Sequence, residues 1–147
     1  MTTTLVVVAQ RSRARLFDHK ASGKGLTEIQ DLVHPEARLH GLDLETERPG
    51  RVHDRVGPAR HGMAQEETTK EREASNFARE VADAIETRRT HEGFDQLILI
   101  AEPGFLGMLR KTLDPVSAKN VLGEVRKEIV DRKVDEIAGY LKDLLIV

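Results

Sequence analysis

The chain has 147 residues, of which 39% are hydrophobic and 33% charged, as is typical of one compact domain with a strongly solvated surface. The 23 basic and 25 acidic residues give a net charge of −2, which excludes attraction of the whole molecule to phosphate. Cysteine is absent, which excludes disulfides and thiolate metal sites, and the 3% of aromatic residues offer few platforms for stacking nucleic-acid bases.

The first apolar run, at residues 5–9, has no positive region before it and no small-residue cleavage site after it. It therefore predicts a buried central strand and not a secretory signal. No apolar stretch approaches the length of a membrane span, so we expect a cytoplasmic protein without membrane contact. Residues 14–19 and 26–33, separated by a Gly-Lys-Gly turn, predict two further strands of an antiparallel meander.

The segment at about 35–65 is polar, rich in Gly and Pro, and alternates Arg with Asp and Glu. It can bury too little apolar surface to offset the entropy of ordering it, and it therefore predicts a long flexible loop. Loops of this length inside a compact domain are uncommon and often functional. The histidines of the loop match no compact ligand spacing, so the sequence predicts neither a metal site nor a cofactor.

The rest of the chain alternates helices and strands. Apolar residues at helical spacing predict a long helix at about 67–89, and QLILIA at 96–101 predicts a second fully buried strand. Pro103 suits the start of a helix. Asp114 and Pro115 are expected to end this helix and to begin another, short one. Alternation at 121–129 predicts an edge strand, and a closing helix is expected from about 134, with Asp131 placed to cap it.

Right-handed crossovers leave few topologies for this order of elements. We predict an α/β fold with one domain over residues 1–147, built on a five-stranded mixed sheet in the order 3-2-1-4-5 with helices on both faces, the ribonuclease-H-like arrangement. A nuclease of that fold needs a cluster of carboxylates to hold two metal ions. The first strand has no acid, and Glu102 alone follows the fourth, where it suits the first turn of a helix. The sequence therefore argues against nuclease activity.

Three arginines, Arg11, Arg13 and Arg15, crowd the first hairpin, close to the expected start of the helix at Pro103. Ligands of open α/β sheets bind at the carboxyl ends of the strands, and a helix N-terminus beside arginines favours an anion. Alternatively, the three arginines only solvate the hairpin and protect its backbone.

Several motifs, in the same order over nearly the whole chain, resemble the bacterial host-attachment protein family: VVVAQRSRARLF, EIQDLVHPEARLH, ERPGR, RHGM, FAREVADAIE and FDQLILIAEPGFLGMLRK. The resemblance implies a fold like that of the middle domain of archaeal and eukaryotic peptide-chain release factors. In release factors, the loop before the long helix carries a Gly-Gly-Gln tripeptide whose Gln positions water against the ester of peptidyl-tRNA. The similar stretch here is 62–65, Gly-Met-Ala-Gln, which lacks the second Gly and has an additional residue before the Gln.

Three functions stay open at this point. The leading hypothesis is a non-catalytic binding module that contacts RNA, the ribosome or a protein partner through its polar loop and first hairpin, with any role in attachment to host cells indirect. Its candidate RNA- or anion-binding residues are Arg11, Arg13, Arg15, Arg48, Arg51, Arg55 and Arg60. One alternative is a ribosome-rescue type peptidyl-tRNA hydrolase in which Gln65 orients water beside His61. The other is a sensor of small anionic ligands at the crevice.

Overall fold

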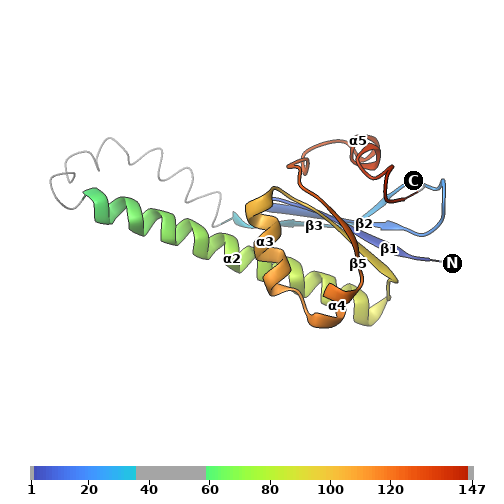
Figure 1. Ribbon diagram of the computed structural model, residues 1–147, viewed down its shortest axis with the longest axis horizontal. Helices are drawn as coiled ribbons and strands as arrows, with labels where there is room; N and C mark the ends of the chain where they lie inside the picture. Colours follow the sequence, from blue (N-terminus) through green and yellow to red (C-terminus); the bar gives the residue numbers. More distant parts are fainter. Residues whose placement is uncertain (1, 36–58, 146–147) are drawn as a thin grey trace.

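The computed structural model describes residues 2–35 and 59–145, with side chains in the long helix described from Thr69 onward. The elements follow in the order β1 (Thr4–Ala9), β2 (Arg13–His19), β3 (Thr27–Val33), α2 (Ala59–His91), β4 (Gln96–Ile100), α3 (Pro103–Thr112), α4 (Pro115–Lys119), β5 (Val121–Val125) and α5 (Val134–Gly139). The strands form one sheet in the order β3-β2-β1-β4-β5 (Figure 1). The predicted fold class and strand order are confirmed.

The pairing of the strands follows from how each is connected. β1 pairs antiparallel with β2, and β2 pairs antiparallel with β3, which confirms the predicted meander. β1 and β4 pair in parallel in the middle of the sheet, and β5 joins β4 in parallel at one edge. Gly23 and Gly25 have φ values of 74° and 71° in the β2–β3 connection, a region that glycine adopts without steric cost.

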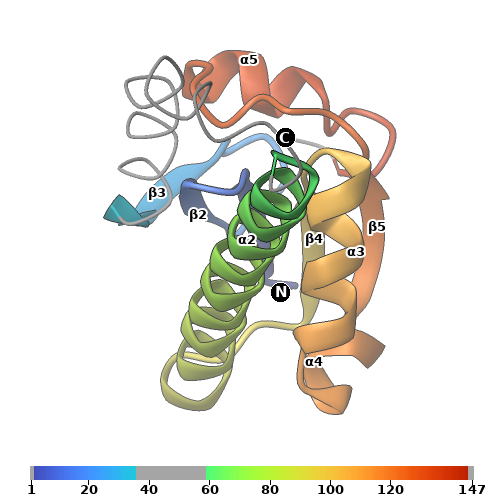
Figure 2. The ribbon, with the colours of Figure 1, turned by 90° about the vertical axis from the view of Figure 1, so that its left-hand side faces the viewer.

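The sheet is covered on both faces, as predicted. Alternate residues of β1 point to opposite faces, so Leu5 and Val7 belong to one core while Val6 and Val8 belong to the other. The first core packs against α2 and α3, which Figure 2 shows side by side. The second core lies beneath the chain that follows β5 and includes Ile137 of α5. A strand buried on both faces needs a continuous apolar run, which explains the composition of β1 and β4.

Helix α2 is 33 residues long and begins at Ala59. The predicted start near residue 67 is therefore wrong, because residues 59–65, assigned to the loop, belong to the helix. Most of these residues are strong helix formers, and the one glycine among them, Gly62, costs only about 1 kcal/mol. Pro58, directly before Ala59, also suits the start of a helix. The rest of the predicted loop, 36–58, lies outside the described residues.

The first part of α2 projects past the carboxyl ends of β1 and β4 (Figure 1). The residues of α2 that are buried in the core are Ala74, Phe77, Ala78, Val81, Ala82 and Ile85. Described side chains of the helix before Ala74 are exposed or half-buried. We call residues 59–73 the arm. In the part of the chain described here, no helix has both the length and the apolarity to cross a lipid bilayer.

The chain after β5 departs from the sequence prediction in two ways. β5 ends at Val125, so the strand predicted to reach residue 129 is wrong in its second half. Ile129 and Val130 are instead buried in the second core, and this burial draws the connection away from the edge of the sheet and across its face. Asp131 does not cap α5, whose N-cap is Lys133 without a side-chain hydrogen bond.

Two glycines provide a matched prediction about packing. A Cβ at Gly107 in α3 would meet nothing within 4 Å, whereas a Cβ at Gly123 in β5 would lie 2.9 Å from Cδ2 of Leu144. Gly107→Ala is expected to raise the free energy of unfolding by about 0.5–1 kcal/mol, because glycine weakens a helix interior. Gly123→Ala must displace Leu144 and is expected to lower the free energy of unfolding. Urea unfolding measures both, and a destabilised Gly107→Ala variant would contradict this packing.

Candidate functional site

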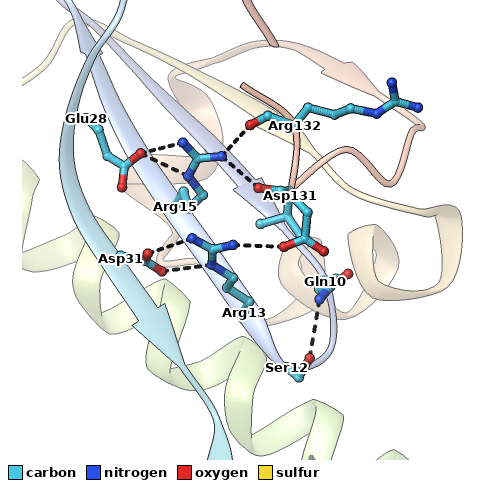
Figure 3. Close-up of polar contacts among 9 residues, drawn as sticks. Gln10, Ser12, Arg13, Arg15, Glu28, Asp31, Asp131 and Arg132 are labelled. Atoms are coloured by element: carbon cyan, nitrogen blue, oxygen red, sulfur yellow. Dashed lines mark hydrogen bonds and ion pairs between the residues drawn. The ribbon is translucent and has the colours of Figure 1, made fainter. Parts of the chain in front are cut away.

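Arg13 lies at the start of β2 and joins three segments of the chain (Figure 3). Its Nε and Nη2 donate to the two carboxylate oxygens of Asp31 in β3, at 3.1 and 2.8 Å. Its Nη1 donates to Oδ1 of Asp131, in the connection before α5, at 2.8 Å. Two carboxylates therefore neutralise this guanidinium, and the hydrogen bonds from Arg13 hold the pKa of Asp31 below its usual value.

Arg15 lies two residues along the same strand and is only 8% exposed. Its Nε and Nη2 donate to Oε1 of Glu28 at 2.9 and 2.6 Å. Its Nη1 donates to the main-chain carbonyls of Val130 and Arg132, at 2.8 and 2.7 Å. Figure 3 shows both guanidinium groups lying between β3 and this connection. Arg15 therefore clamps the chain before α5 onto the sheet, a structural role that leaves little of it to a ligand.

Arg11 stands in the turn between β1 and β2, where its Nε lies 4.0 Å from Oε1 of Glu102. Glu102 is the N-cap of α3, and its carboxylate accepts hydrogen bonds from the main-chain nitrogens of Gly104 and Phe105, at 3.0 and 2.7 Å. The prediction that Glu102 suits a first helical turn is confirmed. Its carboxylate already occupies the position at the helix N-terminus that an anionic ligand would take.

A cavity of about 440 Å³ opens beside this network, lined by Gln10, Ser12, Arg13, Asp31, Val33 and Asp131. Two carboxylates and one guanidinium line it, so the lining carries a net negative charge, which disfavours an anionic ligand. Across the residues that the structure describes, no group of three or more His, Asp or Glu side chains is arranged to hold a metal ion. The hydrogen bonds of this site bind parts of the chain to one another.

The remaining predicted site residues lie elsewhere. Arg48, Arg51 and Arg55 fall outside the described residues. Arg60, His61 and Gln65 belong to α2, where their side chains are not described. The structure thus brings Arg13 and Arg15 into one network, places Arg11 against Glu102, and places Gln65 in a helix where a loop was expected.

The sequence prediction missed the burial of His34. His34, directly after β3, is 4% exposed, and its Nε2 lies in a hydrogen bond of 2.8 Å with Oε2 of Glu73. Its ring centroid lies 5.3 Å from that of Phe77, and its main-chain nitrogen donates to the carbonyl of Ser12 at 2.9 Å. His34 therefore anchors the end of β3 to α2 at the point where the arm begins. A histidine among others at the entrance of a polar segment gives no signal of this burial.

The Arg13–Asp31 pair predicts a dependence of stability on acid. Because the pKa of Asp31 is lower in the folded chain, its stabilising contribution is present above the unfolded pKa, about 3.9, and is lost as the pH falls through the folded value. Asp31→Asn should therefore reduce the loss of stability between pH 5 and pH 2, measured by urea unfolding. Asp135→Asn, at an exposed position, serves as the control. Equal acid dependence in the wild type and in Asp31→Asn would contradict the pairing.

Comparison with known proteins identifies relatives of this chain. The family described as "Protein required for attachment to host cells" matches residues 5–141. No curated protein matches the sequence. Among 17 matching chains of solved structures, one from the archaeal translation termination factor aRF1 has 12% identity and a TM-score of 0.53, covering 96% of this chain and 37% of that one. Another, named only "Archaeal protein", has 14% identity and a TM-score of 0.48, covering 96% and 36%.

These likenesses differ in what they show. At 12% identity, the similarity to the termination factor concerns the fold alone, and this chain spans little more than a third of that protein. The family match extends over nearly all of the described sheet and helices, from β1 to the residues just after α5. The chain therefore belongs to the family of proteins required for attachment to host cells.

Proposed function

We propose that this protein is a non-catalytic binding module that contacts a macromolecular partner through the arm of α2. The observation that carries the proposal is the projection of the arm past the sheet (Figure 1). Among the side chains of the helix that the structure describes, from Thr69 onward, the first buried one is Ala74. A helix gains most of its stability from packing, and a segment of this length is marginal alone in water. A partner that packs on the arm would supply stabilising contacts that the domain core does not provide.

Of the three classes of partner, RNA, the ribosome and a protein, the geometry favours a protein surface. Arg13 and Arg15, two of the cations proposed to contact phosphate, are already paired with carboxylates. The sequence of the arm carries both signs of charge, and the chain as a whole is slightly acidic. Binding to nucleic acid requires a basic surface that is free to replace counterions. A surface with both signs of charge instead suits a protein partner whose charges are complementary to it.

Site-specific photo-crosslinking in living cells tests this proposal. A photoreactive amino acid replaces Lys70, which is exposed on the arm, and in a matched variant it replaces Lys119, which is exposed on α4 at the far end of the domain. We expect a discrete protein adduct from position 70 and none from position 119. RNA in the adduct would overturn the choice of a protein partner, and equal labelling from both positions would overturn the role of the arm.

Within this proposal, any effect on attachment to host cells is indirect, because the protein acts through its partner and not as an adhesin. The family description concerns attachment and does not specify where the protein acts. Antibody labelling of intact cells, compared with permeabilised cells, tests this part. Native protein displayed on the surface of intact cells would contradict it.

The two alternatives are less well supported. A release-factor-like hydrolase would need Gln65 in a loop that can approach an ester, whereas α2 includes this residue together with His61. We expect no cleavage of peptidyl-tRNA by the wild type, and cleavage that Gln65→Ala abolishes would show an enzyme. A small-anion sensor at Arg11 would need the N-terminus of α3, which Glu102 caps. Arg11→Gln should accordingly leave any effect of inorganic phosphate on the midpoint of thermal unfolding unchanged.

A further inference from the structure

The sheet face beneath α5 ends in a row of polar side chains. Thr4 of β1 is paired with His19 of β2 on one side and with Gln96 of β4 on the other. Paired residues of neighbouring strands point to the same face, and two residues farther along, the paired row belongs to the second core: Val6, Phe17 and Ile98. The polar row therefore continues an otherwise apolar face. Thr4 is 1% exposed and His19 is 5% exposed.

A cavity of about 510 Å³ lies over this row. Its other walls include Lys20 and Ser22 from the β2–β3 connection and Leu144 and Leu145 from the end of the chain. Leu144 packs so closely on Gly123 that a Cβ there would lie 2.9 Å from its Cδ2, which fixes this wall on β5. Figure 1 shows the start of β1, the β2–β3 connection and the last described residues after α5 together, at the end of the molecule opposite the start of α2.

The lining has a defined chemical character. The hydroxyl of Thr4 donates to Oε1 of Gln96 at 3.2 Å, so the amide of Gln96 turns its nitrogen, a donor, elsewhere. Lys20, 67% exposed, stands at the mouth with its Nζ 4.0 Å from Asp18. None of the described residues that line the cavity is an Asp or Glu. Hydrogen-bond donors and one ammonium group, without a lining carboxylate, favour an anion, and the two leucines add apolar surface.

We infer that this cavity binds a small organic anion, whose carboxylate or phosphate monoester group meets Gln96 and Lys20 while its apolar part rests on Leu144 and Leu145. The volume suits such a ligand, since small-molecule sites occupy about 300–1,000 Å³. The inference is independent of the proposed contact through the arm, because the two sites lie at opposite ends of the domain (Figure 1).

Nuclear magnetic resonance of the full chain tests the site, with hexanoate, hexyl phosphate and the neutral hexanol as probes. We expect at least one of the two anions to shift the amide signals of Thr4, Ser22 and Gln96 in a saturable way, whichever of the two head groups it carries. Hexanol should bind at least about tenfold more weakly, because it lacks the charge. Saturation by neither anion, or equal binding of hexanol, would overturn the inference.

A matched pair of variants assigns the binding to the polar row. Gln96→Glu keeps the oxygen that accepts from Thr4 but brings a negative charge into the lining, and it should weaken the anion by about tenfold or more. Gln30→Glu makes the same change at an exposed position of β3 and should bind like the wild type. Lys20→Gln, a substitution at an exposed side chain, should weaken binding by about threefold. Wild-type affinity in both Gln96→Glu and Lys20→Gln would place the ligand elsewhere and refute the site.

Discussion

Arg15→Met is expected to lower the free energy of unfolding by about 2–4 kcal/mol. The substitution keeps the apolar stem of the side chain but removes the guanidinium that binds the carbonyls of Val130 and Arg132. Those carbonyls lose a charged donor in a place where Arg15 itself is only 8% exposed. Because this donor ties the connection before α5 to the sheet, the loss should also loosen the layer that covers the second core. Urea unfolding at neutral pH gives the change in stability.

Arg13→Met is the matched control for this prediction. Arg13 makes two ion pairs where Arg15 makes one, but its side chain is 32% exposed and its partner Asp131 is 72% exposed. Exposed pairs contribute little, so the control should lose less than about 1 kcal/mol. Arg15→Lys, which keeps the charge but loses the forked donors, should fall between the two. Equal losses for Arg15→Met and Arg13→Met would contradict the clamp assigned to Arg15.

Phe77→Ala is expected to lower the free energy of unfolding by about 3–5 kcal/mol, because it opens a cavity in the main core. Phe77 is fully buried between the sheet and α3, with its ring centroid 6.1 Å from that of Phe105 and 5.3 Å from that of His34. It therefore connects α2 to both α3 and the end of β3.

Asn76→Ala supplies the control, because Asn76 is exposed on the same helix one residue earlier. It should change the stability by less than about 0.5 kcal/mol. Thermal unfolding followed by circular dichroism compares the two variants. A loss for Phe77→Ala no greater than that for Asn76→Ala would show that α2 is not anchored through this ring.

The order of the strands could be predicted because two features of the sequence determine it. After their polar first residues, β1 and β4 are apolar at every position, so both faces of each strand are apolar. This places the two strands in the middle of a covered sheet. The handedness of crossover connections then leaves few arrangements for the remaining strands, and the predicted order is one of them. Neither feature depends on individual side-chain contacts.

The role of Arg15 could not be predicted for a physical reason. Its acceptors are main-chain carbonyls more than a hundred residues farther along the chain, and every residue has such a carbonyl. The predicted strand beyond Val125 failed similarly, since alternation cannot distinguish a strand from an irregular connection that buries Ile129 and Val130.

The polar row beneath α5 could not be predicted because strand register is not visible in the sequence. Thr4, His19 and Gln96 each stand near the end of a strand, where a polar residue suggests only a boundary. They become one row solely through the register of three strands. The arm was missed because its sequence lacks the apolar periodicity of a packed helix.

Hydrogen exchange along α2, measured with and without the partner identified by crosslinking, tests the central claim that the arm is a binding surface. We predict that the bound partner slows exchange of main-chain amides in residues 59–73, while amides of β4 and β5 exchange as they do in the free protein. Slowing confined to other parts of the chain, with no change in the arm, would contradict it.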